Sequence, residues 1–408
     1  MYVQIVVLLM TKKCFSVFEF NDSQYIMRLS SNGRYMEHTF PANKGPHREE
    51  LFEAIDGALA DIEKRLNEYL SNPKTGHVVD GIYIGDLGIV YTYYILGDPC
   101  WERLLKGLQR SLNPNDHRVT ILESNMFASI MEGNEDQVCE YAQRAIQMDA
   151  KECEVLYGRA GCLLGLLFAK RRHPGWRLDD HIRTLARQIV LAGKASNRVH
   201  LMWEWHSKEY LGAIHGVAGI LLTLCLCGRE MLEEIEPGAN ELIKSTADFM
   251  LSRYSHSSGN VQSSTSTDAD LLVHFCHGAT GWIPLICTLD KMFPGLYVEH
   301  AKRLGEVVWR RGIIANKGPG ICHGTSGSIC ALLEIFTQTG DDEWLHKAQW
   351  FSFYVSENWK RFNPLADRPN SLFEGMCGAF YALSLTHILT GDRTRFTNST
   401  SLFPGFII

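Results

Sequence analysis

Three features are missing from this 408-residue sequence, and each absence excludes a class of protein. No uncharged apolar run reaches about 18 residues, so we expect no membrane-spanning helix. Lys and Arg form no run or stripe and the net charge is −6, which argues against a nucleic-acid partner. The apolar stretch 1–10 lacks a basic segment before it and a cleavage site after it, so no signal peptide is predicted, and Met10 is a second candidate start.

The chain does contain twelve cysteines, but they are scattered along it. Several lie inside apolar runs, where a free cysteine behaves as a small hydrophobic side chain. These are Cys162, Cys225, Cys287 and Cys330. The distribution favours a reducing compartment over a disulfide framework. We therefore expect a cytoplasmic protein, and peripheral contact with the plasma membrane stays an open alternative.

A short glycine motif repeats along the chain. Gly-x-x-Gly opens a strongly apolar stretch in six clear copies, whose second glycines lie 46 to 73 residues apart. A degenerate copy without glycines lies near Ser124 to Phe127, inside the longest interval. The clear copies are Gly85–Gly88, Gly158–Gly161, Gly216–Gly219, Gly278–Gly281, Gly324–Gly327 and Gly375–Gly378.

Stretches with the periodicity of amphipathic helices alternate with these apolar segments. In 51–70, for example, Leu51, Ile55 and Leu59 share one face. Seven such stretches are predicted, at 51–70, 101–112, 135–149, 179–193, 240–254, 297–312 and 342–359.

The alternation predicts the architecture. A helix that is apolar all round must be buried, and a helix with one apolar face can cover it. We find no strand signals and expect negligible strand. We therefore predict an all-α fold, an α/α toroid of seven helix pairs with an inner ring sheathed by an outer one; an open helical solenoid is the alternative. Although the length alone favours two domains, we expect a single domain over 1–408, in which 1–45 packs on or near the barrel and 46–408 forms the repeats.

The repeat also predicts where chemistry lies. Glycine at a helix start allows close approach of another chain and leaves the N–H groups of the helix N-terminus bare for an anion. If the inner helices all begin at one end of the barrel, their N-termini surround one pocket.

Metal-competent side chains precede two of the motifs in phase with the repeat. Cys-His-Gly occurs as Cys276-His277-Gly278 and again as Cys322-His323-Gly324. Thiolate and imidazole are natural zinc ligands, and three protein ligands leave a fourth position for a substrate. For one pair alone, buried cysteines and core histidines would be the better interpretation. Two pairs in phase favour a metal.

Other polar residues near the motifs are ambiguous. His215 stands at the repeat position of His277 and His323, but a single histidine before a helix is often a cap. Glu154 and Arg159 flank the second clear copy, where an ion pair is the more common role. Glu374 is equally ambiguous.

With these segments in hand, the chain resembles the eukaryotic LanC-like (lanthionine synthetase C-like) proteins. The matching segments, in order, are LYGRAG, YLGAIHGVAG, LLVHFCHGATG, KGPGICHGTSG and SLFEGMCG. The resemblance covers nearly the whole chain, and the doubled Cys-His-Gly is its most specific element. It implies a seven-fold α/α toroid, one zinc ion per chain held by Cys276, Cys322 and His323, and glutathione as substrate or ligand.

The resemblance also implies roles for residues around that site. His215 matches the acid/base histidine of the family, and Glu154 and Arg159 match polar residues of the pocket. Lys317 matches a lysine that contacts glutathione. The loop before SLFEG reads PLADRPN and departs from the family's pattern, so the basic residue expected there is displaced to Arg368, beside Asp367.

The implied activity is addition of the glutathione thiol to dehydroalanine or dehydrobutyrine residues in proteins, with phosphate elimination from phosphoserine or phosphothreonine beforehand. Protein partners would therefore carry dehydroamino acids or phosphate. A zinc- and glutathione-binding redox or signalling adaptor without turnover is the alternative, and the altered loop favours it somewhat. A metal-free barrel glycosidase would need paired carboxylates, and the motifs offer only scattered ones.

Overall fold

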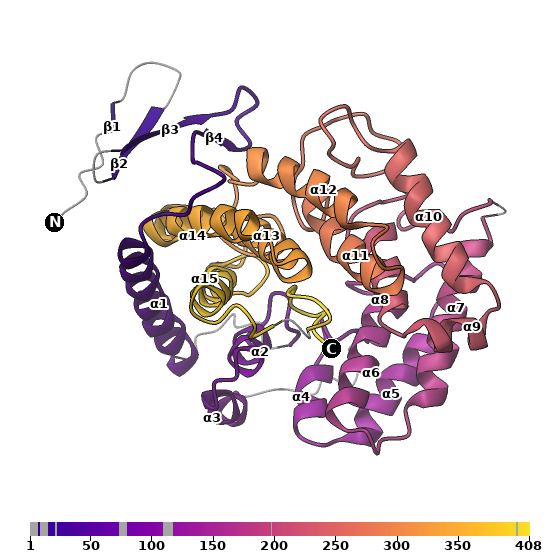
Figure 1. The fold of residues 1–408 in the computed structure, drawn as a ribbon. Coiled ribbons are helices and arrows are strands. Elements are labelled where there is room, and N and C mark those ends of the chain that lie inside the picture. Colours follow the sequence, from indigo (N-terminus) through magenta and orange to yellow (C-terminus); the bar gives the residue numbers. More distant parts are fainter. Residues whose placement is uncertain are drawn as a thin grey trace.

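Two concentric rings of helices make up most of the molecule (Figure 1). The computed structural model describes residues 7–8, 15–20, 23–72, 80–108, 117–196, 198–396 and 399–408. The seven amphipathic stretches form the outer helices α1 (Arg48–Ser71), α3 (Cys100–Gly107), α5 (Glu135–Ile146), α7 (Asp179–Lys194), α10 (Ala239–Arg253), α12 (Val298–Arg311) and α14 (Asp342–Phe362). The apolar segments form the inner helices α2 (Leu87–Leu96), α4 (Met126–Met131), α6 (Arg159–Arg172), α8 (Val217–Cys225), α11 (Ala279–Met292), α13 (Thr325–Thr339) and α15 (Met376–Gly391).

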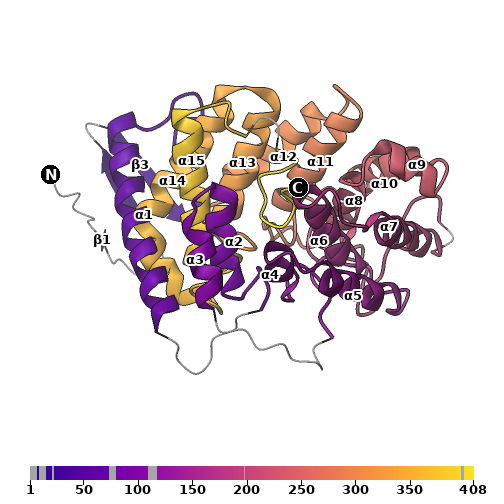
Figure 2. The ribbon, with the colours of Figure 1, turned by 90° about the horizontal axis from the view of Figure 1, so that it is seen from below.

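The inner ring is closed. Each inner helix contacts the next along the chain, and the last, α15, contacts the first, α2. Seen from the side, helices of both rings run next to one another along the ring axis (Figure 2). This closure excludes the open solenoid and confirms the predicted toroid of seven pairs. The degenerate copy supplies α4, the shortest inner helix, and a short extra helix, α9 (Arg229–Ile235), precedes α10.

The repeated glycines are explained by close backbone packing. In all six clear copies a Cβ atom on the second glycine would lie only 1.8–2.4 Å from the carbonyl oxygen six residues earlier. Gly219 against Ala213 and Gly161 against Val155 are the closest of these approaches. Only glycine fits, because the loop before each inner helix folds back onto the first turn of that helix.

The prediction of negligible strand was wrong for the N-terminal region. Four antiparallel strands form a sheet in the order β1-β2-β3-β4, namely β1 (Val7–Leu8), β2 (Phe15–Phe20), β3 (Ser23–Leu29) and β4 (Met36–His38). The sheet lies outside the ring, where β4 contacts α12 (Figure 1). In β3, Met27 is fully buried while Ile26 and Leu29 are exposed. Apolar side chains on both faces remove the two-residue alternation by which a strand is recognised.

The chain end fills the centre of the ring. Segment 399–408 runs inside the inner helices (Figure 1), and Phe403 and Phe406 are fully buried there. The buried carboxylate of Glu334 on α13 accepts hydrogen bonds from the Ser401 hydroxyl, at 3.0 Å, and from the Leu402 amide, at 2.5 Å. Burial raises the pKa of this carboxyl to about 6.

Among the helices of the described residues, none is both long and apolar enough to cross a membrane.

We expect Phe403→Ala to lower the free energy of unfolding by about 3–5 kcal/mol, the usual cost of deleting a buried phenyl ring. Phe403 stacks on Phe275 with 4.4 Å between ring centroids, so removing its ring leaves a cavity at the centre of the inner ring of helices. Denaturant unfolding followed by circular dichroism measures the change. Val199→Ala is the control, because Val199 is 92% exposed and should change stability by less than about 0.5 kcal/mol. Equal stability of both variants would contradict a packed chain end.

Candidate metal centre

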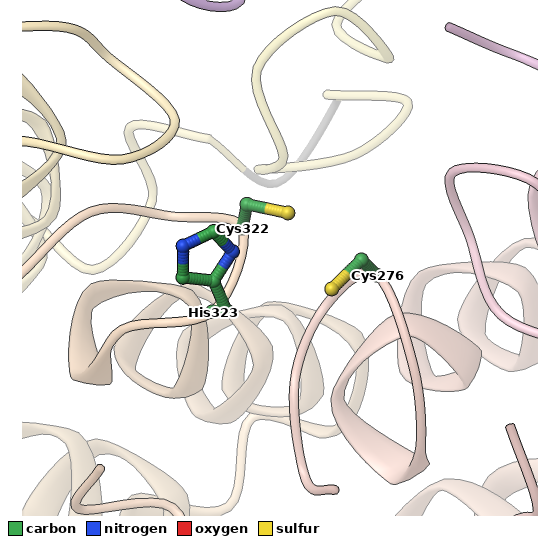
Figure 3. A group of neighbouring side chains, drawn as sticks. All are labelled: Cys276, Cys322 and His323. Atoms are coloured by element: carbon green, nitrogen blue, oxygen red, sulfur yellow. The ribbon is translucent and has the colours of Figure 1, made fainter. Parts of the chain in front are cut away.

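Cys276, Cys322 and His323 come together at one end of the inner ring. Cys276 lies in the loop before α11, and the other two lie in the loop before α13. Their ligand atoms all lie within 4.8 Å of one another. Figure 3 shows the two cysteine side chains approaching each other from neighbouring loops, with the His323 ring beside Cys322. In the described residues no other group of three metal-competent side chains meets in this way.

The donor set fits zinc. A tetrahedral zinc ion with bonds of about 2.0–2.3 Å holds its ligand atoms roughly 3.5–4 Å apart, which small side-chain rotations reach from the observed spacing. Burial, and then the neighbouring Cys276, raise the pKa of the Cys322 thiol well above its usual value. A divalent cation reverses this effect by stabilising the thiolate. Two thiolates would also balance the charge of the ion, so these residues suit Zn²⁺.

Backbone hydrogen bonds between the loops bring the ligands together. The amide of Cys276 donates to the carbonyl of Cys322 at 3.2 Å. The amide of Cys322 in turn donates to the carbonyl of Phe373 at 2.7 Å, and the amide of Phe373 to that of Tyr83 at 3.1 Å. Backbone hydrogen bonds therefore connect each of these loops to the loop of the next repeat. The last of them, between Phe373 and Tyr83, joins the repeats of α15 and α2, where the ring closes.

In five of the six clear copies, a polar or ionisable residue directly precedes the first glycine of the motif. These residues are Tyr157, His215, His277, His323 and Glu374. Several of these side chains interact electrostatically with side chains of neighbouring repeats. Burial, followed by the charges of His215, His274 and His323, lowers the pKa of His277 to about 4. Although burial alone would lower it, Cys322 and Glu374 hold the pKa of His323 above its usual value. These side chains therefore lie near one another at one end of the ring.

His215 and Glu154 form a hydrogen-bonded pair at this end of the ring. Nδ1 of His215 lies 2.7 Å from Oε2 of Glu154, whose side chain is buried. Glu154 also accepts the backbone N–H groups of Leu156, at 2.9 Å, and of Tyr157. Because an ionised carboxylate only accepts, Nδ1 of His215 donates, and Nε2 is left to exchange a proton with a bound molecule.

Trp205 packs on a face of the same imidazole, and no sequence pattern had pointed to this residue. Its indole stacks on the His215 ring at 4.1 Å with only 2° between the planes. A tight turn with reciprocal backbone bonds joins Trp205 to Lys208. At its tip, His206 (φ 49°) and Ser207 (φ 59°) both adopt the left-handed conformation. Such conformations cost of order 1 kcal/mol or more each in non-glycine residues. The turn follows directly after Trp205, the residue that stacks on His215.

The loop of His215 packs directly on the metal loop. A Cβ atom on Gly212 would lie 1.8 Å from the carbonyl oxygen of Cys276. His215, which pairs with Glu154, and the Cys-Cys-His cluster therefore belong to adjoining loops at the same end of the ring.

Comparison with known proteins agrees with this geometry. The model of the lanthionine synthetase C-like protein family matches residues 120–399. The chain belongs to this LanC-like family. It is 30% identical over 375 residues to the "Glutathione S-transferase LANCL1" of Danio rerio, which covers 84% of this chain and 89% of the relative. It is 29% identical over 236 residues to the "LanC-like protein GCL1" of Arabidopsis thaliana, across 55% of this chain and 53% of the relative.

A solved structure shares the fold of this LanC-like chain. The structure of "Nisin cyclase" superposes with a TM-score of 0.61 at 12% sequence identity, covering 85% of this chain and 96% of the cyclase. At that identity the likeness supports the helical toroid alone.

Arg159 of the LanC-like chain has a structural environment. It is buried, and its guanidinium donates to the carbonyls of Met148 and Asp149, the latter at 2.6 Å, just after the end of α5. Its Nε donates to Gln188 on α7 at 3.0 Å. These bonds tie α6 to the outer helices, as a basic side chain at a helix C-terminus often does. A catalytic role for Arg159 stays a prediction without support from its contacts.

The residues predicted to bind glutathione lie in two separate loops, one before α13 and one before α15. Lys317 is half-buried, and its charge adds to the burial that lowers the pKa of His274 to about 3. It opposes the rise in the pKa of His323. Asp367 and Arg368 are exposed. Both act on Glu374, whose pKa is raised mainly by burial and further by Asp367, while Arg368 opposes the rise. The altered loop thus acts electrostatically on Glu374, the residue before the first glycine of the last motif.

Proposed function

We propose that this chain holds a zinc ion on Cys276, Cys322 and His323 and adds the glutathione thiol to dehydroalanine and dehydrobutyrine residues of proteins. The observation that carries the proposal is the Cys-Cys-His cluster beside the Glu154–His215 pair on adjoining loops. Family membership, and a Danio rerio relative named a glutathione S-transferase, support C–S bond formation as the reaction class.

Zinc in this site would take the sulfur of the thiol substrate as its fourth ligand and lower the pKa of that thiol. The side chains supply the rest. The thiol proton passes to Nε2 of His215, and Glu154 stabilises the imidazolium that forms. The sulfur then forms a bond to the β-carbon, and the electrons of the C=C bond move to the α-carbon and carbonyl as an enolate. Nε2 of His215 returns the proton to the α-carbon, which leaves the imidazole neutral. Lys317 offers its ammonium to a glutathione carboxylate.

The proposed protein substrates include chains that carry phosphoserine or phosphothreonine. In this elimination neutral His215 accepts the α-proton at Nε2, the electrons of that C–H bond form the C=C bond, and the β-carbon–oxygen bond breaks to release phosphate. The dehydroamino acid is then left for thiol addition. Because the guanidinium of Arg159 is committed to carbonyls and Gln188, Lys317 is the better candidate to hold the leaving phosphate.

The test is mass spectrometry of a dehydroalanine peptide incubated with glutathione and zinc-loaded protein. The expected product gains one glutathione, and it forms well above the rate without protein. A second incubation with the matching phosphoserine peptide tests elimination separately. If neither peptide gains glutathione above the background rate, the enzymatic proposal fails.

The second candidate is a zinc- and glutathione-binding adaptor without turnover. The exposed Asp367 and Arg368, in a loop that departs from the family's pattern, favour it. Calorimetry separates the two candidates, because glutathione binding to zinc-loaded protein without any adduct would select the adaptor. We place either function in the cytoplasm, since the eleven cysteines in the described residues are all free thiols.

A further inference from the structure

Tyr83 contacts the candidate metal centre from a third repeat. Its hydroxyl donates a hydrogen bond to Sγ of Cys322 at 2.7 Å. The phenol is buried and stacks on Phe373, with 4.4 Å between ring centroids and 22° between planes. Hydrogen bonds of its own backbone to Leu122 and Phe373 fix the residue on both sides. The hydroxyl is thus held against one sulfur.

The repeat gives this tyrosine a specific place. Tyr83 stands two residues before Gly85, just as Cys276 and Cys322 stand two residues before Gly278 and Gly324. The same repeat position therefore supplies both sulfur ligands and the hydroxyl that donates a hydrogen bond to one of them. Among the described residues, no hydroxyl donates in the same way to Cys276.

We infer that Tyr83 is a positioning residue of the metal centre, whose hydroxyl shields the Cys322 thiolate so that this sulfur does not react as a nucleophile. The inference rests on the metal site of the proposed function and deepens it. During thiol addition an electrophilic alkene would meet three thiolates, two from the protein and one from the substrate. A hydrogen bond to a charged acceptor withdraws electron density and lowers its nucleophilicity. Cys322 is shielded in this way, so the substrate sulfur reacts.

The test compares Tyr83→Phe with wild type and with Tyr91→Phe. Tyr91 is also a fully buried tyrosine, but its hydroxyl accepts a hydrogen bond from the amide of Gly405 at the centre of the ring, away from the metal ligands. Each protein is loaded with Co²⁺ in place of zinc, and its sulfur-to-cobalt charge-transfer band is recorded. Each is also treated, loaded with zinc, with iodoacetamide, which forms an S–C bond as iodide leaves; peptide mapping then gives the alkylation rate at each cysteine.

We expect Tyr83→Phe to keep one metal ion, to shift the charge-transfer band and to alkylate Cys322 on the order of tenfold faster. That factor corresponds to loss of one charge-assisted hydrogen bond. Tyr91→Phe should match wild type in both measurements. Phe373→Leu leaves the hydroxyl but removes the stacked ring, and it should give an intermediate rate. This variant decides the matter should Tyr83→Phe not fold.

Several outcomes overturn the inference. An unchanged band and an unchanged rate in Tyr83→Phe would do so, as would a metal ion lost from Tyr83→Phe but kept by Tyr91→Phe, because the hydroxyl would then hold the ligand in place without shielding it. In both cases the proposed metal site stands, since wild type binds the ion. If wild type binds neither cobalt nor zinc, the metal site of the proposed function fails, and the inference fails with it.

Discussion

Cys322→Ala should remove most of the zinc from a protein that otherwise carries about one ion per chain. The substitution leaves two ligands, Cys276 and His323, and a structural or catalytic zinc ion needs at least three from the protein. Loss of an outer partner of a zinc ligand already costs about 10- to 100-fold in affinity. Loss of the ligand itself should cost more than about 100-fold. Elemental analysis after reconstitution with zinc and dialysis measures the content.

Cys330→Ala is the matched control for this experiment. Cys330 is a fully buried free thiol on α13, the helix that begins just after Cys322 and His323. Its loss changes the core next to the site but no ligand, so zinc content should stay at the wild-type level. Wild-type protein without zinc after reconstitution would refute the site, and equal losses in both variants would indicate general unfolding.

The helical rings could be predicted because burial acts on whole segments. An inner helix such as α8 is buried along its entire length, and an outer helix such as α7 alternates buried and exposed residues with the helical period. These patterns are local in the sequence. Ring closure between α15 and α2 is not local. The uneven spacing of the repeats favoured a closed ring over an open solenoid, and the contact between these two helices confirms the closure.

Contacts between distant residues explain what the sequence did not reveal. Tyr83 reaches Cys322 across 239 positions of the chain, through the closure of the ring. Trp205 reaches His215 through a turn of non-glycine residues with positive φ, for which no residue type gives a clear signal. For Tyr83 the repeat register was a usable signal, because the residue occupies the place of the two cysteines. For Arg159 the motif position suggested the pocket, whereas the side chain bonds to the outer helices.

His215→Ala should keep zinc and fold but lose thiol addition by roughly the 10²–10⁴-fold typical of a missing acid/base group. The residue is not one of the three clustered ligands, and its Nδ1 is committed to Glu154, so the expected loss is that of proton transfer at Nε2. Zinc content and the rate of adduct formation are measured on the same preparation. His173→Ala is the control. His173 also stacks on an indole, that of Trp176 at 4.1 Å, but it follows the far end of α6 and should not affect the rate.

Each pattern of results assigns His215 one role, because zinc content and rate respond to different atoms. If His215→Ala abolishes zinc binding, the residue is a ligand and the role proposed here is wrong. If it changes neither quantity, the imidazole only caps its helix and fills the space between Glu154 and Trp205. Glu154→Gln separates the contributions within the pair, since the amide can still accept from Nδ1 but no longer stabilises an imidazolium by its charge. An intermediate rate in this variant, with full zinc, would therefore assign proton donation to His215 and its electrostatic support to Glu154.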